Sequence, residues 1–97
     1  QFMAAYIIAD SNVTDPAAYE QYRARVPAAI AKHGGRFLAR GGEVAVLEGD
    51  WSPRRVVVIE FPSLEAAKAF YDSPEYQAAR ALRAGAATID MLAVAGV

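Results

Sequence analysis

The sequence predicts an α+β fold whose elements follow the order βαββαβ. With 97 residues, the chain is long enough for one hydrophobic core and too short for two. Short β-favouring runs alternate with stretches whose apolar residues recur every three or four positions. Right-handed crossovers then give an antiparallel sheet with the helices on one face, a ferredoxin-like domain over residues 3–97. A methionine in third place indicates that Gln1 and Phe2 are left over from an expression vector.

The beginning of the chain supplies a strand and a helix. Residues 4–10 are apolar and end in turn-forming residues, which indicates a strand. Asp15 suits the N-cap of a helix and Pro16 its first position, and the double glycine at 34–35 ends that helix. Pro27 falls inside it and predicts a kink.

The rest of the chain supplies the remaining strands and two short helices. A strand at 36–40 is followed by the run 44–48, which either continues it past a bulge or forms a separate ribbon. Residues 55–61 are rich in valine and form the clearest strand. Ser63 caps a helix, Ser73-Pro74 restarts the chain as another short helix, and 88–94 is the last strand.

Alternation along the strands predicts two unlike sheet faces. The apolar set should lie beneath the helices; it comprises Ala5, Ile7, Ala9, Phe37, Ala39, Val57, Ile59, Phe61, Ile89, Met91 and Ala93. The mixed set comprises Tyr6, Ile8, Asp10, Arg36, Leu38, Arg40, Val56, Val58, Glu60, Asp90, Leu92 and Val94. Because its aliphatic members favour burial while its charges need partners or water, we expect a second copy to cover this face and form a homodimer.

Composition excludes several classes of function. The net charge is −1 with scattered basic residues, so neither nucleic acid nor a membrane is an expected partner. The chain has no cysteine and one histidine, which argues against thiolate chemistry and a metal site, and no cofactor is predicted. No apolar run reaches the roughly 18 residues of a membrane span, and no signal peptide is recognisable, so we expect a cytoplasmic protein.

Several motifs together resemble the bacterial domain of unknown function 1330 family. They are Val26-Pro27 with His33-Gly34-Gly35-Arg36, Arg40-Gly41-Gly42, Leu47-Glu48-Gly49, Val58-Ile59-Glu60-Phe61-Pro62-Ser63 and Tyr71-Asp72-Ser73-Pro74-Glu75-Tyr76. The resemblance runs from Met3 nearly to the C-terminus. It implies a dimeric α+β barrel, a superfamily that includes cofactor-independent antibiotic-biosynthesis monooxygenases and muconolactone isomerase, but it implies no reaction and transfers no catalytic residue.

The candidates for catalysis are His33, Arg40 and Glu60. His33, next to the double glycine, is an acid or base near the cleft or simply interacts with the helix C-terminus. Arg40 could orient an acidic ligand, or pair with a carboxylate such as Glu60 and neutralise itself inside the dimer. No nucleophile motif accompanies them.

Five further residues are candidates for binding a ligand. Asp10 and Asp90 share the mixed set with Glu60, while Tyr6, Tyr22 and Tyr71 could stack on a ring-shaped ligand or belong to the core. Trp51, in the turn between strands, is expected at a dimer seam.

Two functions follow as hypotheses. The first is a dimeric small-molecule-binding protein, including a cofactor-independent enzyme of monooxygenase or isomerase type acting on a small organic acid or aromatic compound. Its pocket would lie between the mixed sheet face and the helices. The alternative is a non-catalytic binding or interaction module whose charged sheet face only specifies dimerisation.

Overall fold

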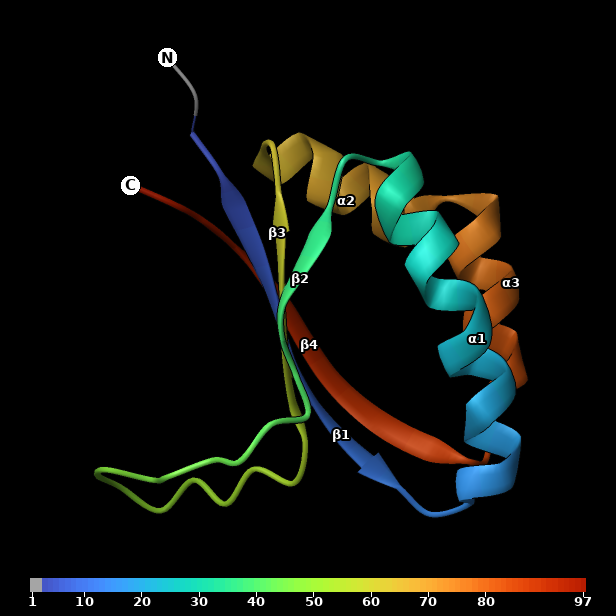
Figure 1. Ribbon diagram of the computed structural model, residues 1–97, viewed down its shortest axis with the longest axis vertical. Helices are drawn as coiled ribbons and strands as arrows, with labels where there is room; N and C mark the ends of the chain where they lie inside the picture. The colour runs from blue at the N-terminus through green and yellow to red at the C-terminus, as the bar shows by residue number, and fades with distance from the viewer. Residues whose placement is uncertain (1–2) are drawn as a thin grey trace.

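The fold is an α+β sandwich of one sheet and one helical layer, as the sequence predicts. The computed structural model describes residues 3–97, and Gln1 and Phe2, assigned above to a vector, lie outside the described residues. The elements are β1 (Ala5–Val13), α1 (Pro16–Lys32), β2 (Arg36–Arg40), β3 (Val56–Phe61), α2 (Leu64–Asp72), α3 (Pro74–Leu82) and β4 (Ala87–Ala95). All three helices cover the same side of the sheet (Figure 1).

The four strands form one antiparallel sheet in the order β2-β3-β1-β4. β1 continues past its predicted end at Asp10 because Ser11, Asn12 and Val13 still pair with β4. The run 44–48 forms no strand: its β-favouring residues have no partner strand, and the segment between β2 and β3 is irregular. Given the strand order, β2 and β4 are the two edges of the sheet.

The helices begin where the sequence indicates. The Asp15 side chain accepts the Ala18 amide at 3.2 Å to cap α1, which continues through Pro27 as one helix. Ser73 serves two helices: its hydroxyl donates to the Phe70 carbonyl at 2.7 Å and accepts the Tyr76 amide at 3.1 Å. This buried serine closes α2 and opens α3, which fixes the corner between them.

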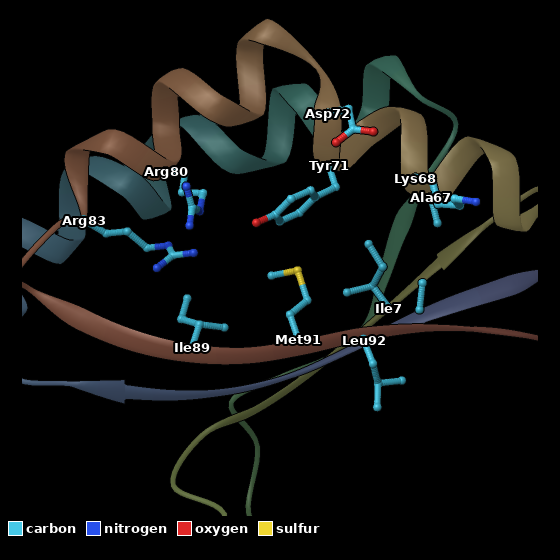
Figure 2. Close-up of a pocket in the computed structure, with 11 residues that line it drawn as sticks. Ile7, Ala67, Lys68, Tyr71, Asp72, Arg80, Arg83, Ile89, Met91 and Leu92 are labelled. Carbon is cyan, nitrogen blue, oxygen red and sulfur yellow. The ribbon is translucent and has the colours of Figure 1, made fainter.

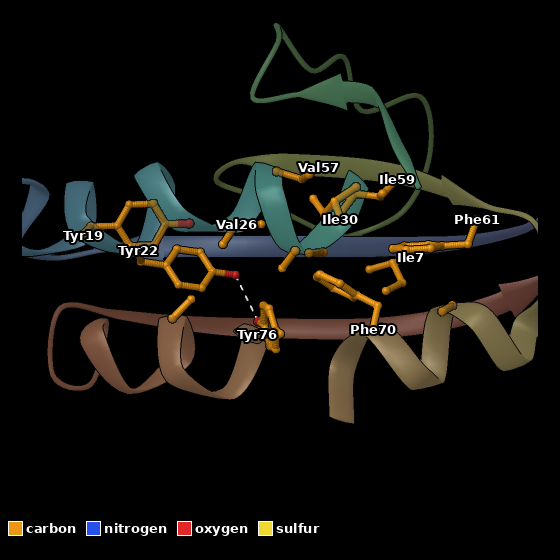
Figure 3. Close-up of a cluster of buried hydrophobic side chains, with 14 of the residues drawn as sticks. Ile7, Tyr19, Tyr22, Val26, Ile30, Val57, Ile59, Phe61, Phe70 and Tyr76 are labelled. Carbon is orange, nitrogen blue, oxygen red and sulfur yellow. Dashed lines mark hydrogen bonds between the residues drawn. The ribbon is translucent and has the colours of Figure 1, made fainter. Parts of the chain in front are cut away.

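Aromatic side chains dominate the core between the layers (Figure 3). Phe70 is the centre of the cluster, with its ring 5.1 Å from that of Phe61 and 4.8 Å from that of Tyr76. Small residues such as Ala5 and Ala9 on β1 leave room for these rings. On β1 and β3 the face assigned to the apolar set is thus buried beneath the helices, whereas on β4 Ile89 and Met91 are half-buried and Ala93 is exposed.

A bulge in β2 corrects the predicted orientation of two residues. The ladder pairs Phe37 with Ile59 but Ala39 with Val58 and Arg40 with Val57, so one extra residue is inserted after Phe37. Since directly opposed residues share a face, Ala39 joins the open side of the sheet and Arg40 the helix side. The guanidinium of Arg40 accordingly lies 4.4 Å from the centre of the Phe37 ring. Strict alternation was wrong for Ala39 and Arg40 because it assumed no insertion.

We call the sheet surface turned away from the helices the open face. It consists of Tyr6, Ile8, Asp10, Asn12, Arg36, Ala39, Val56, Val58, Glu60, Thr88, Asp90, Leu92 and Val94. Leu92 is 57% exposed there, and Val94 is also exposed. Among residues 3–97, no helix has both the length and the apolarity needed to cross a bilayer.

Candidate functional site

A cavity of about 440 Å³ lies between β4 and the helices α2 and α3 (Figure 2). Its floor is apolar and comes from the helix side of the sheet, with Ile7 on β1 and Ile89 and Met91 on β4. Its roof is polar and comes from α2 and from the end of α3. Because β4 is an edge strand, no further strand of the described residues 3–97 closes this side of the cavity. The volume is in the range of sites that take small organic molecules.

The polar groups of the cavity are mainly cationic. Lys68 and Asp72 come from α2, Arg80 from α3, and Arg83 from the residue that caps α3. Within the described residues 3–97, none of these four side chains takes part in an ion pair. Three cations and one carboxylate therefore give the lining an uncompensated positive charge.

Arg83 is held in place by the core. Its guanidinium lies 5.3 Å from the centre of the Tyr22 ring, a cation–π arrangement. Its Nε is buried and has no hydrogen-bond partner among the described residues. The side chain reaches toward the cavity from the end of α3 (Figure 2). The Tyr22 ring thus holds the Arg83 guanidinium in a fixed position at the wall of the cavity.

Tyr22 supports Arg83 without lining the cavity. Its hydroxyl lies 3.0 Å from that of Tyr76, with both side chains buried. Burial, together with the neighbouring Tyr76, raises the pKa of Tyr22 far above its usual range. Tyr22 therefore stays neutral and acts as a packing surface for the arginine.

Tyr71 is the one predicted ligand-binding residue that lines the cavity. α2 presents its half-buried ring to the floor, and its hydroxyl points into the space below Arg80 (Figure 2). The ring also packs 5.3 Å from that of Tyr76, which connects it to the core cluster. Tyr71 thus combines a flat apolar surface with a hydrogen-bonding group.

His33 lies apart from this cavity, at the end of α1. It caps the helix, and its ring packs edge-on against Phe70 at 6.3 Å. Its Nε2 is 4.0 Å from Oε1 of Glu75, which already pairs with Lys32 at 2.9 Å. The hydrogen bond from Lys32 lowers the pKa of Glu75. His33 thus lies beside the Lys32–Glu75 ion pair that joins α1 to α3.

The remaining predicted residues lie at the open face or the β2 edge. Glu60 accepts a hydrogen bond from Arg36 Nε at 2.8 Å, the two being direct partners across the β2–β3 ladder. Asp10 accepts the amide of Arg54 at 2.9 Å and of Arg55 at 3.2 Å, and these bonds, that of Arg54 first, lower its pKa. Asp90 is exposed and opposes Asp10 on β4.

The structure does not bring His33, Arg40 and Glu60 together. Arg40 and Glu60 belong to opposite faces of the sheet after the bulge, and Glu60 already has Arg36 as a partner. Tyr6, half-buried on the open face, opposes Glu60 across β1 and β3. The cavity between the sheet and the helices lies on the apolar face, whereas the hollow on the mixed face is enclosed by the segment between β2 and β3 and not by a helix.

Sequence reasoning missed the cations of the cavity. Lys68 and Asp72 are one turn apart, and Arg80 and Arg83 are three positions apart, so each pair lies on one side of its helix. This helical spacing next to Tyr71 was the signal available in the sequence, but only Tyr71 was recognised as a candidate. Among residues 3–97, no group of three or more acidic or histidine side chains could hold a metal ion.

Comparison with solved structures shows the same fold in several bacterial proteins. RPA0582 of Rhodopseudomonas palustris, described as a protein of unknown function, is 19% identical with a TM-score of 0.71, covering 95% of this chain and 82% of that chain. SnoaB of Streptomyces nogalater, described as a cofactor-independent oxygenase, is 16% identical with a TM-score of 0.63, covering 94% and 90%. At these identities the likeness shows the fold alone.

A third structure carries a description of its assembly. A protein of unknown function from Thermobifida fusca, described as dimeric and ferredoxin-like, is 23% identical with a TM-score of 0.54, covering 100% of this chain and 93% of that chain. No curated protein matches the chain. The family model for the domain of unknown function DUF1330 matches residues 4–97, and the chain therefore belongs to the DUF1330 family.

Proposed function

We propose that the protein is a homodimer that binds a small organic acid with an apolar or aromatic body in the cavity beneath α2 and α3. The observation that carries this proposal is the pairing of an apolar floor with three cations that have no ion-pair partner in residues 3–97. An organic anion satisfies both surfaces at once. Its body covers Ile89 and Met91 while its carboxylate meets Arg80 and Arg83.

Arginine in particular favours a carboxylate ligand. A guanidinium presents a planar set of donors that matches two carboxylate oxygens, and Arg83 is already fixed against Tyr22. Tyr71 adds a ring for stacking and one hydroxyl for a hydrogen bond. Because packing against the core already holds Arg83 and Tyr71 in place, binding such a ligand costs little conformational entropy of the protein.

The homodimer is supported by the open face. Leu92 and Val94 are exposed there, and Glu60 on the same face is already paired with Arg36. That pair suits an interface better than a catalytic site, because neither group is free to bind a substrate. Pairing two open faces leaves the cavity, which is on the helix side, accessible in each copy.

Catalysis is a second candidate function on the same cavity. The likeness to an oxygenase described as cofactor-independent supports it, and the Tyr71 hydroxyl is the group of the lining placed for proton transfer. The alternative is binding without turnover, in which the open face serves only dimerisation. Incubating the protein with a bound acid, with and without oxygen, separates the two: product formation that Tyr71→Phe abolishes supports catalysis, whereas unchanged ligand supports binding alone.

The binding proposal is tested with matched probes. Benzoate and 1-naphthoate, each compared with the corresponding alcohol, are titrated into the protein and followed by amide chemical shifts. We expect the acids to shift residues of α3 and β4, and Arg83→Gln to weaken that binding by about tenfold or more. Arg25→Gln, an exposed change on α1 outside the cavity, is the control. Alcohols that bind as well as acids, or acids that shift no cavity residue, would contradict the proposal.

A further inference from the structure

The segment between β2 and β3, residues 41–55, projects from the sheet as an arm. Figure 1 shows it leaving the lower end of the sheet on the side away from the helices, so that it stands beside the open face. It contains no strand or helix, and it reverses at Gly49, which has a φ of +91°. Glu48 and Asp50 flank this turn and mark the tip of the arm.

Both ends of the arm are fixed to the sheet. The Gly41 amide donates to the Val56 carbonyl at 2.9 Å, and the Ser11 amide donates to the Arg55 carbonyl at 3.0 Å. The Asp10 carboxylate adds the two bonds to the amides of Arg54 and Arg55. These bonds hold the base of the arm in one direction relative to the sheet.

The arm exposes apolar side chains that a globular protein ordinarily buries. Leu47 is 94% exposed and Trp51 is 61% exposed, and Val44 and Val46 are exposed as well. Together with Ala39 and Val56 of the open face, these side chains line a hollow of about 580 Å³. The apolar surface is thus continuous from the arm onto the sheet, which indicates one interface.

The charges of the arm complement one another over its length. The tip carries Glu48 and Asp50, whereas the base carries Arg54 and Arg55 together with a single acidic residue, Glu43. None of these five residues forms an ion pair in the described part of the chain. In a twofold interface each copy presents the same surface, so an acidic tip can meet the basic base of the other arm, twice.

We propose that the arm clasps a second copy of this chain, with the acidic tip of each arm lying against the basic base of the other. This inference rests on the proposed homodimer and deepens it. β1 and β4 have nine residues, β3 six and β2 five, so with a rise of about 3.3 Å and a spacing of about 4.8 Å the sheet measures roughly 460 Å² in plan. A standard interface buries about 800 Å² of accessible surface per partner, and the exposed apolar side chains of the arms add to the surface that the open face offers.

Charge exchange between tip and base tests the clasp. Glu48→Arg with Asp50→Arg makes the tip basic, and Arg54→Glu with Arg55→Glu makes the base acidic. Each pair should raise the dimer dissociation constant, measured by sedimentation equilibrium at low salt, by about tenfold or more, and all four changes together should restore it. A mixture of the two double variants should form heterodimers. Glu65→Arg, on exposed α2, is the charge-reversal control.

Trp51 provides a direct signal, because it is the sole tryptophan of the chain. As the protein concentration is raised through the dimer dissociation constant, the Trp51 emission maximum should shift to a shorter wavelength. The shift should be smaller in the variant with Glu48→Arg and Asp50→Arg. Circular dichroism confirms that each variant is folded.

The outcomes separate the clasp from the homodimer. A wild-type chain that stays monomeric at millimolar concentration overturns both. A dimer whose affinity and Trp51 emission are unmoved by either double variant overturns the clasp and leaves the homodimer standing. If the double variants lose affinity and the variant with all four substitutions does not recover it, the tip-to-base pairing is overturned.

Discussion

The hydroxyls of Tyr22 and Tyr76 lie 3.0 Å apart in the core, where α1 meets α3 (Figure 3). Each hydroxyl is the other's partner, and both side chains are almost fully buried. The pair therefore satisfies two polar groups at once and connects the first helix to the last.

Replacing both of these tyrosines should cost less than the sum of the two single replacements. Tyr22→Phe or Tyr76→Phe leaves a buried hydroxyl without its partner, which should lower the free energy of unfolding by about 1–3 kcal/mol. In the double variant no orphan remains, so its loss should be smaller than the sum. Urea denaturation measures all three, with Tyr6→Phe on the open face as the control. Strictly additive losses would contradict a direct bond.

Gly35 is required by close packing. A Cβ at this position would lie 2.6 Å from Phe61 Cε1 and 2.9 Å from Ile30 Cγ2. Both neighbours are buried, so they have little room to move, and Gly35→Ala should destabilise the protein by about 1–3 kcal/mol. Gly42→Ala is the matched control, because nothing lies within 4 Å of the added methyl group. Equal melting temperatures for the two variants would refute the packing argument.

Much of this fold is predictable from the sequence because local signals and tertiary structure agree. The Ser73-Pro74 step is an example: a serine cap and a proline at the first helical position mark a helix start, and the structure has one there. The buried face likewise follows from alternation along β1 and β3. In each case the residue types alone determine the local geometry.

The wrong predictions concern features that depend on how a segment packs against another element. The bulge in β2 moved Arg40 to the other face, and nothing in the residues 36–40 marks where an extra residue is inserted. Residues 44–48 favour a strand but have no strand to pair with. For the site, Tyr71 was predicted, whereas Arg80 and Arg83 were not, because the rotation of α3 about its axis depends on how Tyr76 packs in the core.

Asp10 should make folding stability depend on pH in the acidic range. The amides of Arg54 and Arg55 lower its pKa in the folded state, so its contribution is present above the unfolded value of about 4 and is lost as pH falls through the folded pKa. Asp10→Asn should therefore be less stable than wild type at pH 7, and the difference should shrink toward pH 2. Thermal unfolding across this range measures it.

Asp90→Asn provides the control for that series. Asp90 opposes Asp10 across β1 and β4 but makes no hydrogen bond within residues 3–97. Removing one of two opposed carboxylates relieves repulsion, so this variant should be at least as stable as wild type at pH 7. A loss at pH 7 as large as that of Asp10→Asn would show that the amide bonds are not the cause.

Asp72 should weaken the binding of organic acids, since it is the one carboxylate of the cavity lining. Asp72→Asn removes a repulsion worth about 1 kcal/mol at 4 Å in water, so the affinity for benzoate or 1-naphthoate should rise by about two- to fivefold. The gain should fall as salt screens the charge, and it should be absent for the corresponding alcohols. Glu65→Gln, on the same helix outside the lining, changes the net charge equally and is the control. An equal gain in both variants would assign the effect to the overall charge of the protein instead of to the cavity.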